Sequence, residues 1–342
     1  MPLWTCGKTT IKMKNILNRL FNHETLSKDE AKTVLVNISN GSYNQSQISS
    51  FLTVYMMRSI SIDELSGFRE ALLDLCIKID LSEYNTIDLC GTGGDGKDTF
   101  NISTLASFVT AGAGINVAKH GNYGVSSISG SSNVMEKLSV KFSNDASFLE
   151  KCINQAGICI LHAPLFHPAM KNVAPIRKEL GVKTFFNMLG PMVNPSFPKN
   201  QLVGVFNLEL ARMYAYLYQN TDVNFNILHS LDGYDEISLT GSTKSISKTK
   251  ETLFNAEDFG LQNLNQNDIQ GGKTIDESAQ MFINILSGKG TEAQNNVVCA
   301  NAGMAIATVH NIEIKQGFEL AKESLLSGKA LNSLNKLQNL SK

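Results

Sequence analysis

A glycine-rich run directly after a short apolar segment is the feature most able to do chemistry. Four glycines occur in residues 91–96, following a strand predicted over residues 86–90. Such a density of glycine costs backbone entropy, so it indicates a loop whose backbone must approach something closely. A predicted helix follows, with Asn101, Ser103 and Thr104 as candidate capping residues. Because free N–H groups and the helix dipole converge at a helix N-terminus, this arrangement predicts a phosphate site.

Two nucleotide-binding motifs fit this loop only in part. Gly91, Gly93 and Gly96 match the dinucleotide fingerprint, which also needs an acidic residue about 20 positions further on. No Asp or Glu occurs between positions 99 and 135. The loop also begins like a Walker A sequence, but Asp98 stands where a Ser or Thr has to hold magnesium. Both motifs are therefore disfavoured, and a glycine-rich turn without a ligand remains the alternative.

A second polar group follows the next predicted strand, residues 114–118. It reads Lys119-His120-Gly121-Asn122, and a serine-rich run over residues 126–133 comes after it. The carboxyl ends of strands are where open α/β sheets bind their ligands. Hydroxyls, N–H groups and a lysine without any carboxylate suit a polyanion. A serine-rich surface loop is the alternative interpretation.

An acidic pair, Asp235-Glu236, follows a third predicted strand, residues 224–229. On a strand the two carboxylates would point apart, whereas in a loop both can reach one hard cation that keeps several waters. The pair is therefore a candidate magnesium site, with a solvated turn as the alternative.

The elements that must position these residues fall into two regions. Residues 13–81 are helical throughout, with a capping box at Ser27 and a last helix ending near Ile79. From Asn85 onward strands and helices alternate, which predicts a mainly parallel sheet covered by helices. Further helices are predicted over 146–156, 168–180, 208–219, 276–287, 295–309 and 316–326. Further strands are predicted over 157–162 and 202–206, with a hairpin or edge strand over 242–250 and a frayed polar tail at the end.

Composition limits the class of protein. The chain has 342 residues, of which 42% are hydrophobic and 18% charged, as in a globular protein with two domains. Its net charge of −1 gives no general attraction to nucleic acid or to an anionic membrane. No apolar run is long enough to span a bilayer. Six cysteines without CxxC or zinc spacing, and no secretory signal, predict reduced thiols and a cytoplasmic location.

Several motifs together resemble the anthranilate phosphoribosyltransferases of tryptophan biosynthesis. They are GTGGDG followed by NIST, then KHGN, SGSSNVMEKL, HPAMKNVAPIRKELGVKTFFNMLGPMVNP, DGYDEIS and NAGMAIA, in consistent order over residues 13–326. The specific combination is KHGN with NMLGPMVNP, because pyrimidine nucleoside phosphorylases of the same fold share the glycine loop. Those relatives typically have Lys-Met-Ser-Gly-Arg where this chain has Lys-His-Gly-Asn.

The resemblance implies an α/β fold class, with a helical N-terminal domain beside a mainly parallel α/β domain. The implied domains are an N-terminal extension (1–12), a helical domain (13–82, completed by helices around 168–195) and an α/β domain (83–342). The implied reaction moves the 5-phosphoribosyl group from phosphoribosyl diphosphate to anthranilate, with Mg²⁺. A homodimer through the helical domain is implied, without nucleic acid or membrane as a partner. Three alternatives are a pyrimidine nucleoside phosphorylase, a non-catalytic nucleic-acid-binding relative and a transferase acting on another aromatic amine.

The resemblance also implies roles for single residues. The implied catalytic residues are Lys119, Asn122 and Arg177, with Arg177 on the anthranilate carboxylate, and the implied magnesium ligands are Ser103, Asp235 and Glu236. Tyr123 stands where many members have arginine, and His162 where an aromatic apolar residue is expected. The implied substrate-binding residues are Gly91, Gly94, Asp95, Thr99, Asn101, Ile102, Ser103, Thr104, Lys119, His120, Gly121, Asn122, Tyr123, Gly124, Val125, Ser126, Ser127, Ser131, His167, Arg177 and Pro191.

Overall fold

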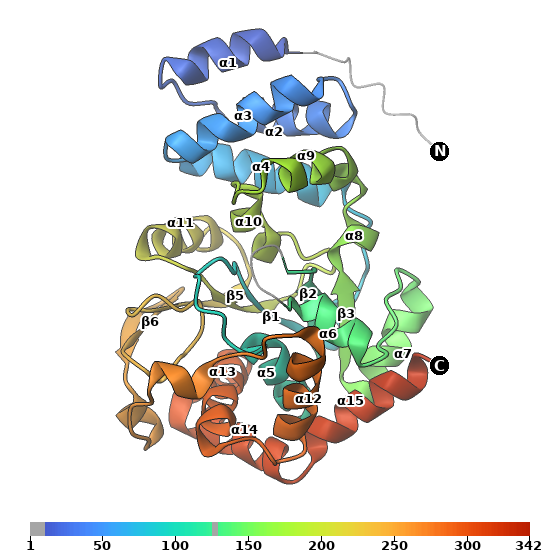
Figure 1. The fold of residues 1–342 in the computed structure, drawn as a ribbon, viewed down its shortest axis with the longest axis vertical. Coiled ribbons are helices and arrows are strands. Elements are labelled where there is room, and N and C mark those ends of the chain that lie inside the picture. The colour runs from blue at the N-terminus through green and yellow to red at the C-terminus, as the bar shows by residue number, and fades with distance from the viewer. Residues whose placement is uncertain (1–10, 125–128) are drawn as a thin grey trace. The chain divides into compact units, whose positions relative to one another are not determined.

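The computed structural model describes residues 11–124 and 129–342 (Figure 1). The chain divides into two compact units, which are described one at a time. Unit 1 comprises Met1–Cys76 and His167–Leu189, and unit 2 comprises Ile77–Phe166 and Gly190–Lys342.

Unit 1 is a helical bundle built from two separate stretches of the chain. The rings of Phe51, Tyr55 and Phe68 pack against Phe185 from the second stretch, and Phe68 stacks on it at 4.5 Å. Aromatic burial therefore ties the second stretch to the first. Its elements are α1 (Met13–Phe21), α2 (Lys28–Ser39), α3 (Gln45–Met57), α4 (Ile62–Leu75), the 3₁₀ helix η2 (Pro168–Asn172), α9 (Ala174–Leu180) and α10 (Phe186–Leu189).

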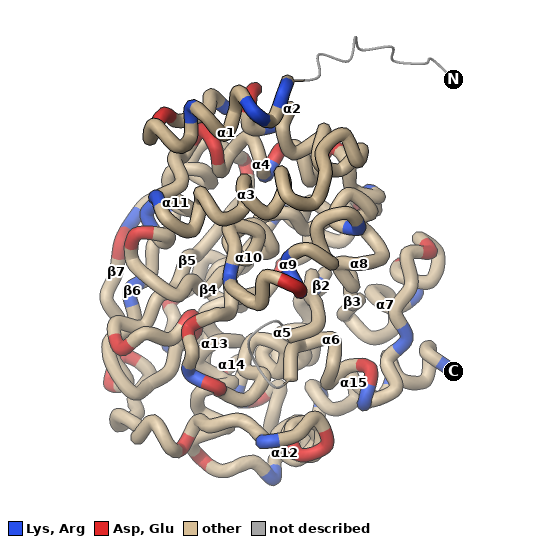
Figure 2. Tube along the Cα trace, turned by 45° about the horizontal axis from the view of Figure 1, so that its top comes forward, with Lys and Arg blue, Asp and Glu red and all other residues tan. Residues whose placement is uncertain are grey.

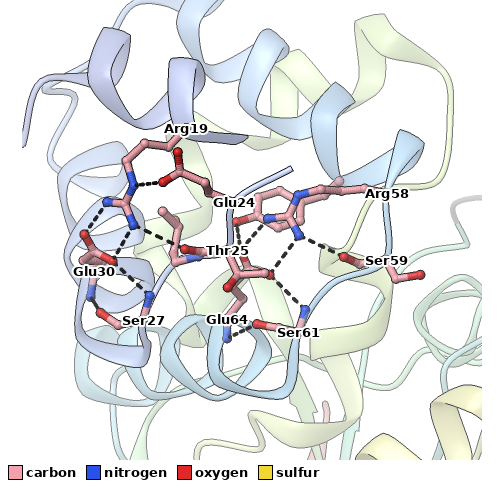
Figure 3. A network of polar contacts seen from close by, with 11 residues as sticks. Arg19, Glu24, Thr25, Ser27, Glu30, Arg58, Ser59, Ser61 and Glu64 are labelled. Atoms are coloured by element: carbon pink, nitrogen blue, oxygen red, sulfur yellow. Dashed lines mark hydrogen bonds and ion pairs between the residues drawn. The ribbon is translucent and has the colours of Figure 1, made fainter. Parts of the chain in front are cut away.

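Two capping boxes in unit 1 each supply a glutamate that also binds an arginine (Figure 3). Glu30 of α2 pairs with Arg19, and both side chains are about one-third exposed. Glu64 of α4 pairs with Arg58 in a nearly dry environment, with the Glu64 side chain 0% exposed. Glu64 also accepts a hydrogen bond from the Tyr55 hydroxyl at 2.9 Å. These contacts outweigh burial and hold the pKa of Glu64 below its ordinary value.

Two helix predictions in unit 1 are wrong. The helix expected over residues 168–180 is interrupted, because η2 ends at Asn172 and α9 begins only at Ala174. Pro175 lacks the N–H group that would continue the earlier turn, so the helix has to start again there. The last helix of the first stretch ends at Leu75 rather than near Ile79, since Cys76 already has extended backbone angles.

Unit 2 is organised around a seven-stranded sheet of order β3-β2-β1-β4-β5-β6-β7. The first five strands are parallel, whereas β6 and β7 add to the edge in antiparallel fashion. This confirms the predicted mainly parallel sheet and its terminal hairpin. The strands are β1 (Ile87–Gly91), β2 (Val117–Gly121), β3 (Ile158–His162), β4 (Asn200–Gly204), β5 (Asn224–Ser230), β6 (Thr243–Ser247) and β7 (Glu251–Phe254).

Helices surround this sheet, and two of them, α5 and α13, are buried on nearly every side (Figure 1). Gly303 of α13 lies against α14, where an added Cβ would be only 2.7 Å from Phe318 Cα. The helices of unit 2 are η1 (Ser82–Tyr84), α5 (Ile102–Gly112), α6 (Ser131–Lys137), α7 (Ala146–Ala156), α8 (Ala163–Phe166), η3 (Gly190–Met192), α11 (Leu208–Tyr218), η4 (Ala256–Phe259), η5 (Gln266–Ile269), α12 (Ile275–Leu286), α13 (Glu292–His310), α14 (Ile314–Leu326) and α15 (Lys329–Leu340).

Two predictions about unit 2 need correction. The end of the chain is not a frayed tail, because α15 buries Ala330, Leu334 and Leu337 at helical spacing. The strand predicted over residues 114–118 begins later, at Val117, since Gly114 has a φ of +93° that an extended strand does not accommodate. Lys119 therefore lies inside β2 rather than after it.

Charged residues of both signs are intermixed along the outer helices and loops of each unit (Figure 2). In this view they do not form a broad area of one sign. Within the described residues, no single helix is long and apolar enough to cross a membrane, and α13 with α14 would meet that criterion only across a bend of 119°. Among the residues that the structure describes, no disulfide joins any two of Cys76, Cys90, Cys152, Cys159 and Cys299.

Candidate functional site

The strand order of unit 2 reverses at β1, which has β2 and β3 on one side and β4 and β5 on the other. Loops at the carboxyl ends of strands diverge at such a point and leave a crevice for a ligand. The glycine loop leaves β1 at this place. A small pocket adjoins it, lined by Leu89, Cys90, Ser103, Ala106, Leu202, Gly204, Leu228, Asp235, Glu236 and Asn301.

The glycine loop and the acidic pair meet directly. The Gly93 N–H donates to Asp235 Oδ2 at 2.7 Å, across 142 residues of sequence. Gly91 leaves room for that carboxylate, because an added Cβ would overlap Asp235 Oδ2 and lie 3.1 Å from its Cγ. The glycines of this loop therefore allow a carboxylate to approach the backbone closely.

The first turn of α5 contacts the other member of the acidic pair. The Ser103 N–H donates to Glu236 Oε1 at 3.2 Å, and the Thr99 hydroxyl lies 3.4 Å from Glu236 Oε2. The expected side-chain cap by Asn101 is absent, since Asn101 Nδ2 donates to Ser129 O at 3.0 Å instead. The dipole and N–H groups of this helix end thus face a carboxylate of the protein itself, and the phosphate site predicted here stays a prediction.

Three carboxyl groups, Asp95, Asp235 and Glu236, share this space. Burial and mutual repulsion raise the pKa values of Asp235 and Glu236. Asp95 Oδ2 is buried, and it has no hydrogen-bond partner in the described part of the chain. Within the described residues no three His, Cys, Asp or Glu side chains form a ready-made metal cluster. A desolvated acidic pair still fits a hard divalent cation that takes its other oxygen ligands from water and phosphate.

Lys119 and His120 lie in β2 and are buried, with exposures of 3% and 7%. Lys119 Nζ donates to Leu89 O of the neighbouring strand at 2.6 Å. Burial lowers the pKa of Lys119, while the charges of Asp88 and Glu236 act in the opposite direction. His120 Nδ1 lies 3.2 Å from Gly190 O. The Lys119 charge is thus buried in β2, and it interacts electrostatically with Glu236 of the acidic pair.

The loop after β2 is attached to the start of α6. Asn122 O accepts from the Ser132 N–H at 3.1 Å and from the Ser131 hydroxyl at 3.2 Å. Gly121 is needed for this approach, since an added Cβ would lie 2.6 Å from Ser131 Oγ. The Gly124 N–H donates to Asn133 Oδ1 at 3.0 Å. These contacts bring the predicted phosphate loop and Ser131 together.

The two departures from the family pattern, Tyr123 and His162, contact each other. Their rings lie edge to face at 4.8 Å, and Phe142 stacks on the other side of His162 at 4.4 Å. His162 Nδ1 pairs with the buried Ser132 hydroxyl at 2.8 Å. Burial lowers the pKa of His162. The histidine therefore acts as an aromatic packing residue beneath Tyr123.

Other predicted residues are placed as follows. Ile102 and Thr104 are buried, so Ile102 offers only its backbone to a ligand. Gly94 has a φ of +79°, a conformation typical of glycine. Pro191 is buried and its carbonyl accepts from the Gln201 side chain. The predicted residues Val125, Ser126 and Ser127 lie outside the described residues.

Two predicted substrate residues, His167 and Arg177, belong to unit 1. Arg177 Nη2 donates to Asn187 Oδ1 at 3.1 Å, and its guanidinium lies over the Phe186 ring at 5.3 Å. Burial lowers the pKa of Arg177. His167 is 4% exposed.

Sequence reasoning missed two residues that organise the site, Asp88 and Asn301. Asp88, inside β1, is fully buried and accepts from the His120 N–H at 3.1 Å and from Asn194 Nδ2 at 2.9 Å. Asn301 binds both the N–H and the carbonyl of Ile237, next to the acidic pair. A charged residue between apolar neighbours in a strand was a usable signal for Asp88. For Asn301, the signal in the sequence was its place in the NAGMAIA motif.

Comparison with known proteins identifies the family. Residues 83–331 match the model described as "Glycosyl transferase family, a/b domain", and residues 14–76 match "Glycosyl transferase family, helical bundle domain". An anthranilate phosphoribosyltransferase of Flavobacterium psychrophilum is 83% identical over 329 residues, which cover 96% of this chain and 100% of the relative. The chain belongs to the anthranilate phosphoribosyltransferase family.

Solved structures of the anthranilate phosphoribosyltransferase family agree with this assignment. The enzyme of Thermus thermophilus matches with a TM-score of 0.88 and 30% identity, covering 95% of this chain and 98% of that one. The Saccharomyces cerevisiae enzyme in complex with PRPP and Mg matches with a TM-score of 0.89 and 26% identity, covering 98% and 99%. The same yeast enzyme in complex with 4-fluoroanthranilate matches with a TM-score of 0.86 and 26% identity, covering 96% and 97%.

Proposed function

We propose that this chain transfers the 5-phosphoribosyl group of phosphoribosyl diphosphate to anthranilate, the second step of tryptophan biosynthesis. The observation that carries the proposal is the meeting of the glycine loop, the α5 N-terminus and the Asp235-Glu236 pair in a chain with 83% identity to a named family member. Helix N-terminal N–H groups suit phosphate, and the acidic pair suits the cation that accompanies a diphosphate.

The reaction breaks the bond between ribose C1′ and the diphosphate oxygen and forms a bond from C1′ to the anthranilate nitrogen, with inversion. Diphosphate leaves with the electron pair of the broken bond, and the amine loses one proton. An aromatic amine is largely uncharged at neutral pH, so a strong general base is unnecessary. Positioning of the two substrates then supplies much of the rate.

Magnesium would be held by Asp235 and Glu236, with Ser103 beside them. When bound, it supplies positive charge that stabilises the leaving diphosphate. Lys119 adds a second positive charge from its buried place in β2, where a low dielectric strengthens its effect. The N–H groups of Gly93 and Ser103 contact the acidic pair and would keep both carboxylates beside the bound cation.

The proposed residues for the sugar phosphate and diphosphate are Gly91, Gly94, Asp95, Thr99, Asn101, Ile102, Ser103, Thr104, residues 119–127 and Ser131. Arg177 is proposed to bind the anthranilate carboxylate, for which its planar fork is better suited than a lysine. Its side chain is already ordered by Asn187 and Phe186, which reduces the entropy lost on binding. Asn122, Gly91, His120, His167 and Pro191 complete the proposed anthranilate contacts.

One experiment separates this function from its alternatives. Purified protein is mixed with magnesium, phosphoribosyl diphosphate and anthranilate, and the anthranilate fluorescence is followed. The proposal predicts a loss of fluorescence that requires all three components. Phosphate-dependent cleavage of thymidine or uridine, with no change in anthranilate, would instead identify a nucleoside phosphorylase.

A homodimer through the helical unit and a cytoplasmic location are also proposed. Exposed apolar side chains in unit 1 support the dimer, since Phe21 of α1 is 57% exposed and Met57 of α3 is 84% exposed. Met57→Glu should lower the molar mass measured by light scattering from dimer to monomer. Leu326→Glu, at a 59% exposed position of unit 2, is the matched control and should leave the dimer intact.

A further inference from the structure

The carboxylate of Asp88 lies beneath the proposed substrate site without being part of it. It is 0% exposed and has two partners from distant segments. Asp88 Oδ1 accepts from the His120 N–H of β2 at 3.1 Å, and Oδ2 accepts from Asn194 Nδ2 at 2.9 Å. A buried charge is tolerated only where such partners replace water.

The contacts of Asp88 replace sheet hydrogen bonds where two strands separate. Over the described residues of both strands, β1 and β2 are registered at one pair, Ile87 with Val117. By contrast, β1 and β4 are registered at five pairs, from Ile87 to Gly91. Beyond that pair, the Asp88 carboxylate accepts a hydrogen bond from the His120 N–H. The Lys119 ammonium donates a hydrogen bond to the Leu89 carbonyl. Side chains thus satisfy backbone groups that a continuous ladder would pair.

Asn194 extends the same network to the turn that follows η3. Its Nδ2 also donates to Ala118 O at 2.8 Å, and its Oδ1 accepts from the N–H and the hydroxyl of Ser196 at 2.9 and 2.8 Å. The amide orientation is therefore fixed, because Nδ2 has only acceptors around it and Oδ1 only donors. Asp88 and Asn194 together hold the backbone of β2 on both sides of Lys119.

The charges of this network are complementary. Asp88 is the negative charge that acts most strongly on Lys119, and Glu236 acts on Lys119 from the acidic pair. Burial raises the pKa of Asp88 to about 6, although Lys119 and Asn194 both oppose that rise. At neutral pH the ionised carboxylate balances the buried ammonium.

We propose that Asp88 is a positioning residue for phosphoribosyl diphosphate. Its two hydrogen bonds fix how far the end of β2 stands from β1, and so where Lys119 and the loop through Asn122 meet the substrate. The inference rests on the proposed function and deepens it. It concerns the sugar-phosphate substrate first, because Lys119, which this network holds, is among the residues proposed for that substrate.

Asp88→Asn tests this with almost no change in shape. In either orientation of the new amide, one N–H donor faces another donor, from His120 or from Asn194. Losing a bond to a buried charged group weakens binding by about 10- to 100-fold. We therefore expect the Kd for phosphoribosyl diphosphate with magnesium, measured by calorimetry, to rise by that factor. The KM for anthranilate should rise by a smaller factor, because Lys119 is proposed for the sugar-phosphate substrate.

Asp80→Asn, at an exposed acid, is the matched control and should leave both constants unchanged. If Asp88→Asn does not fold, Ser196→Ala removes one donor that orients Asn194, and the Kd should rise severalfold with an unchanged Tm.

Three results are distinguishable. A wild-type protein that does not bind phosphoribosyl diphosphate contradicts the proposed function itself. Normal wild-type binding with an unchanged Kd in folded Asp88→Asn, or in Ser196→Ala where Asp88→Asn does not fold, overturns only the role of Asp88. An equal rise of the Kd in the control Asp80→Asn also overturns it, because the effect would then not depend on the buried hydrogen-bond network.

Discussion

Substituting alanine for Gly91 should damage the site without damaging the fold. The added methyl would overlap Asp235 Oδ2 and stand 3.1 Å from its Cγ, so the carboxylate has to move. Its displacement breaks the 2.7 Å hydrogen bond from the Gly93 N–H, which holds the acidic pair against the loop. Gly91 has an ordinary negative φ, so the substitution adds no backbone strain.

The size of the effect follows from that one bond. A hydrogen bond to a charged group contributes about 1.5–3 kcal/mol. If Asp235 can no longer bring the cation to the loop, the loss appears in binding. Since about 1.4 kcal/mol is a factor of ten, Gly91→Ala should weaken magnesium-dependent binding of phosphoribosyl diphosphate by about 10- to 150-fold.

Calorimetric titration of phosphoribosyl diphosphate in the presence of magnesium measures this directly. Gly96→Ala is the matched control in the same loop, because an added Cβ there has no neighbour within 4 Å. Because Gly96 has a φ of +74°, Gly96→Ala should lower the free energy of unfolding by about 1–2 kcal/mol. The variant should keep the wild-type affinity for phosphoribosyl diphosphate. Wild-type affinity in Gly91→Ala, or an equal loss in Gly96→Ala, would refute the steric reasoning.

Three further predictions concern charged residues. Replacing Asp235 and Glu236 by alanine should weaken the dependence of the rate on magnesium, and an identical metal titration would remove them as ligands. Arg177→Ala should raise the KM for anthranilate far more than that for phosphoribosyl diphosphate, whereas an unchanged anthranilate KM would exclude its role. Glu64→Gln should lower the free energy of unfolding by about 3–5 kcal/mol at pH 7, against about 0–1 for Glu30→Gln, the control whose side chain is about one-third exposed. Because the folded-state pKa of Glu64 lies below its ordinary 4.5, its contribution is present above that pH and lost as the pH falls further. Chemical denaturation at pH 7 and pH 3 checks this, and an equal loss in both variants at pH 7 would contradict it.

Local patterns predicted much of the chain correctly because they act over few residues. The capping box at Ser27, the glycine loop before α5 and the acidic pair after β5 all depend on neighbours in sequence. The last two converge because parallel strands have their carboxyl ends at one edge of the sheet. Strand order and direction in an alternating α/β pattern are therefore enough to bring the loop and the acidic pair to the same edge.

Features that depend on tertiary contacts could not be predicted in this way. The polar sequence of α15 becomes a helix because Leu334 and Leu337 find a core to pack against. The bonds from Asp88 to His120 and Asn194 span 32 and 106 residues, so no local pattern contains them. The contact between Tyr123 and His162 is of the same kind.

The central claim is a transfer reaction between two particular substrates. Its most direct test is to measure, in one reaction of the wild-type protein with magnesium, the anthranilate consumed and the diphosphate released. The proposed function predicts equal amounts of the two, and neither when phosphoribosyl diphosphate is omitted. Diphosphate release without loss of anthranilate, or no release at all, would contradict it.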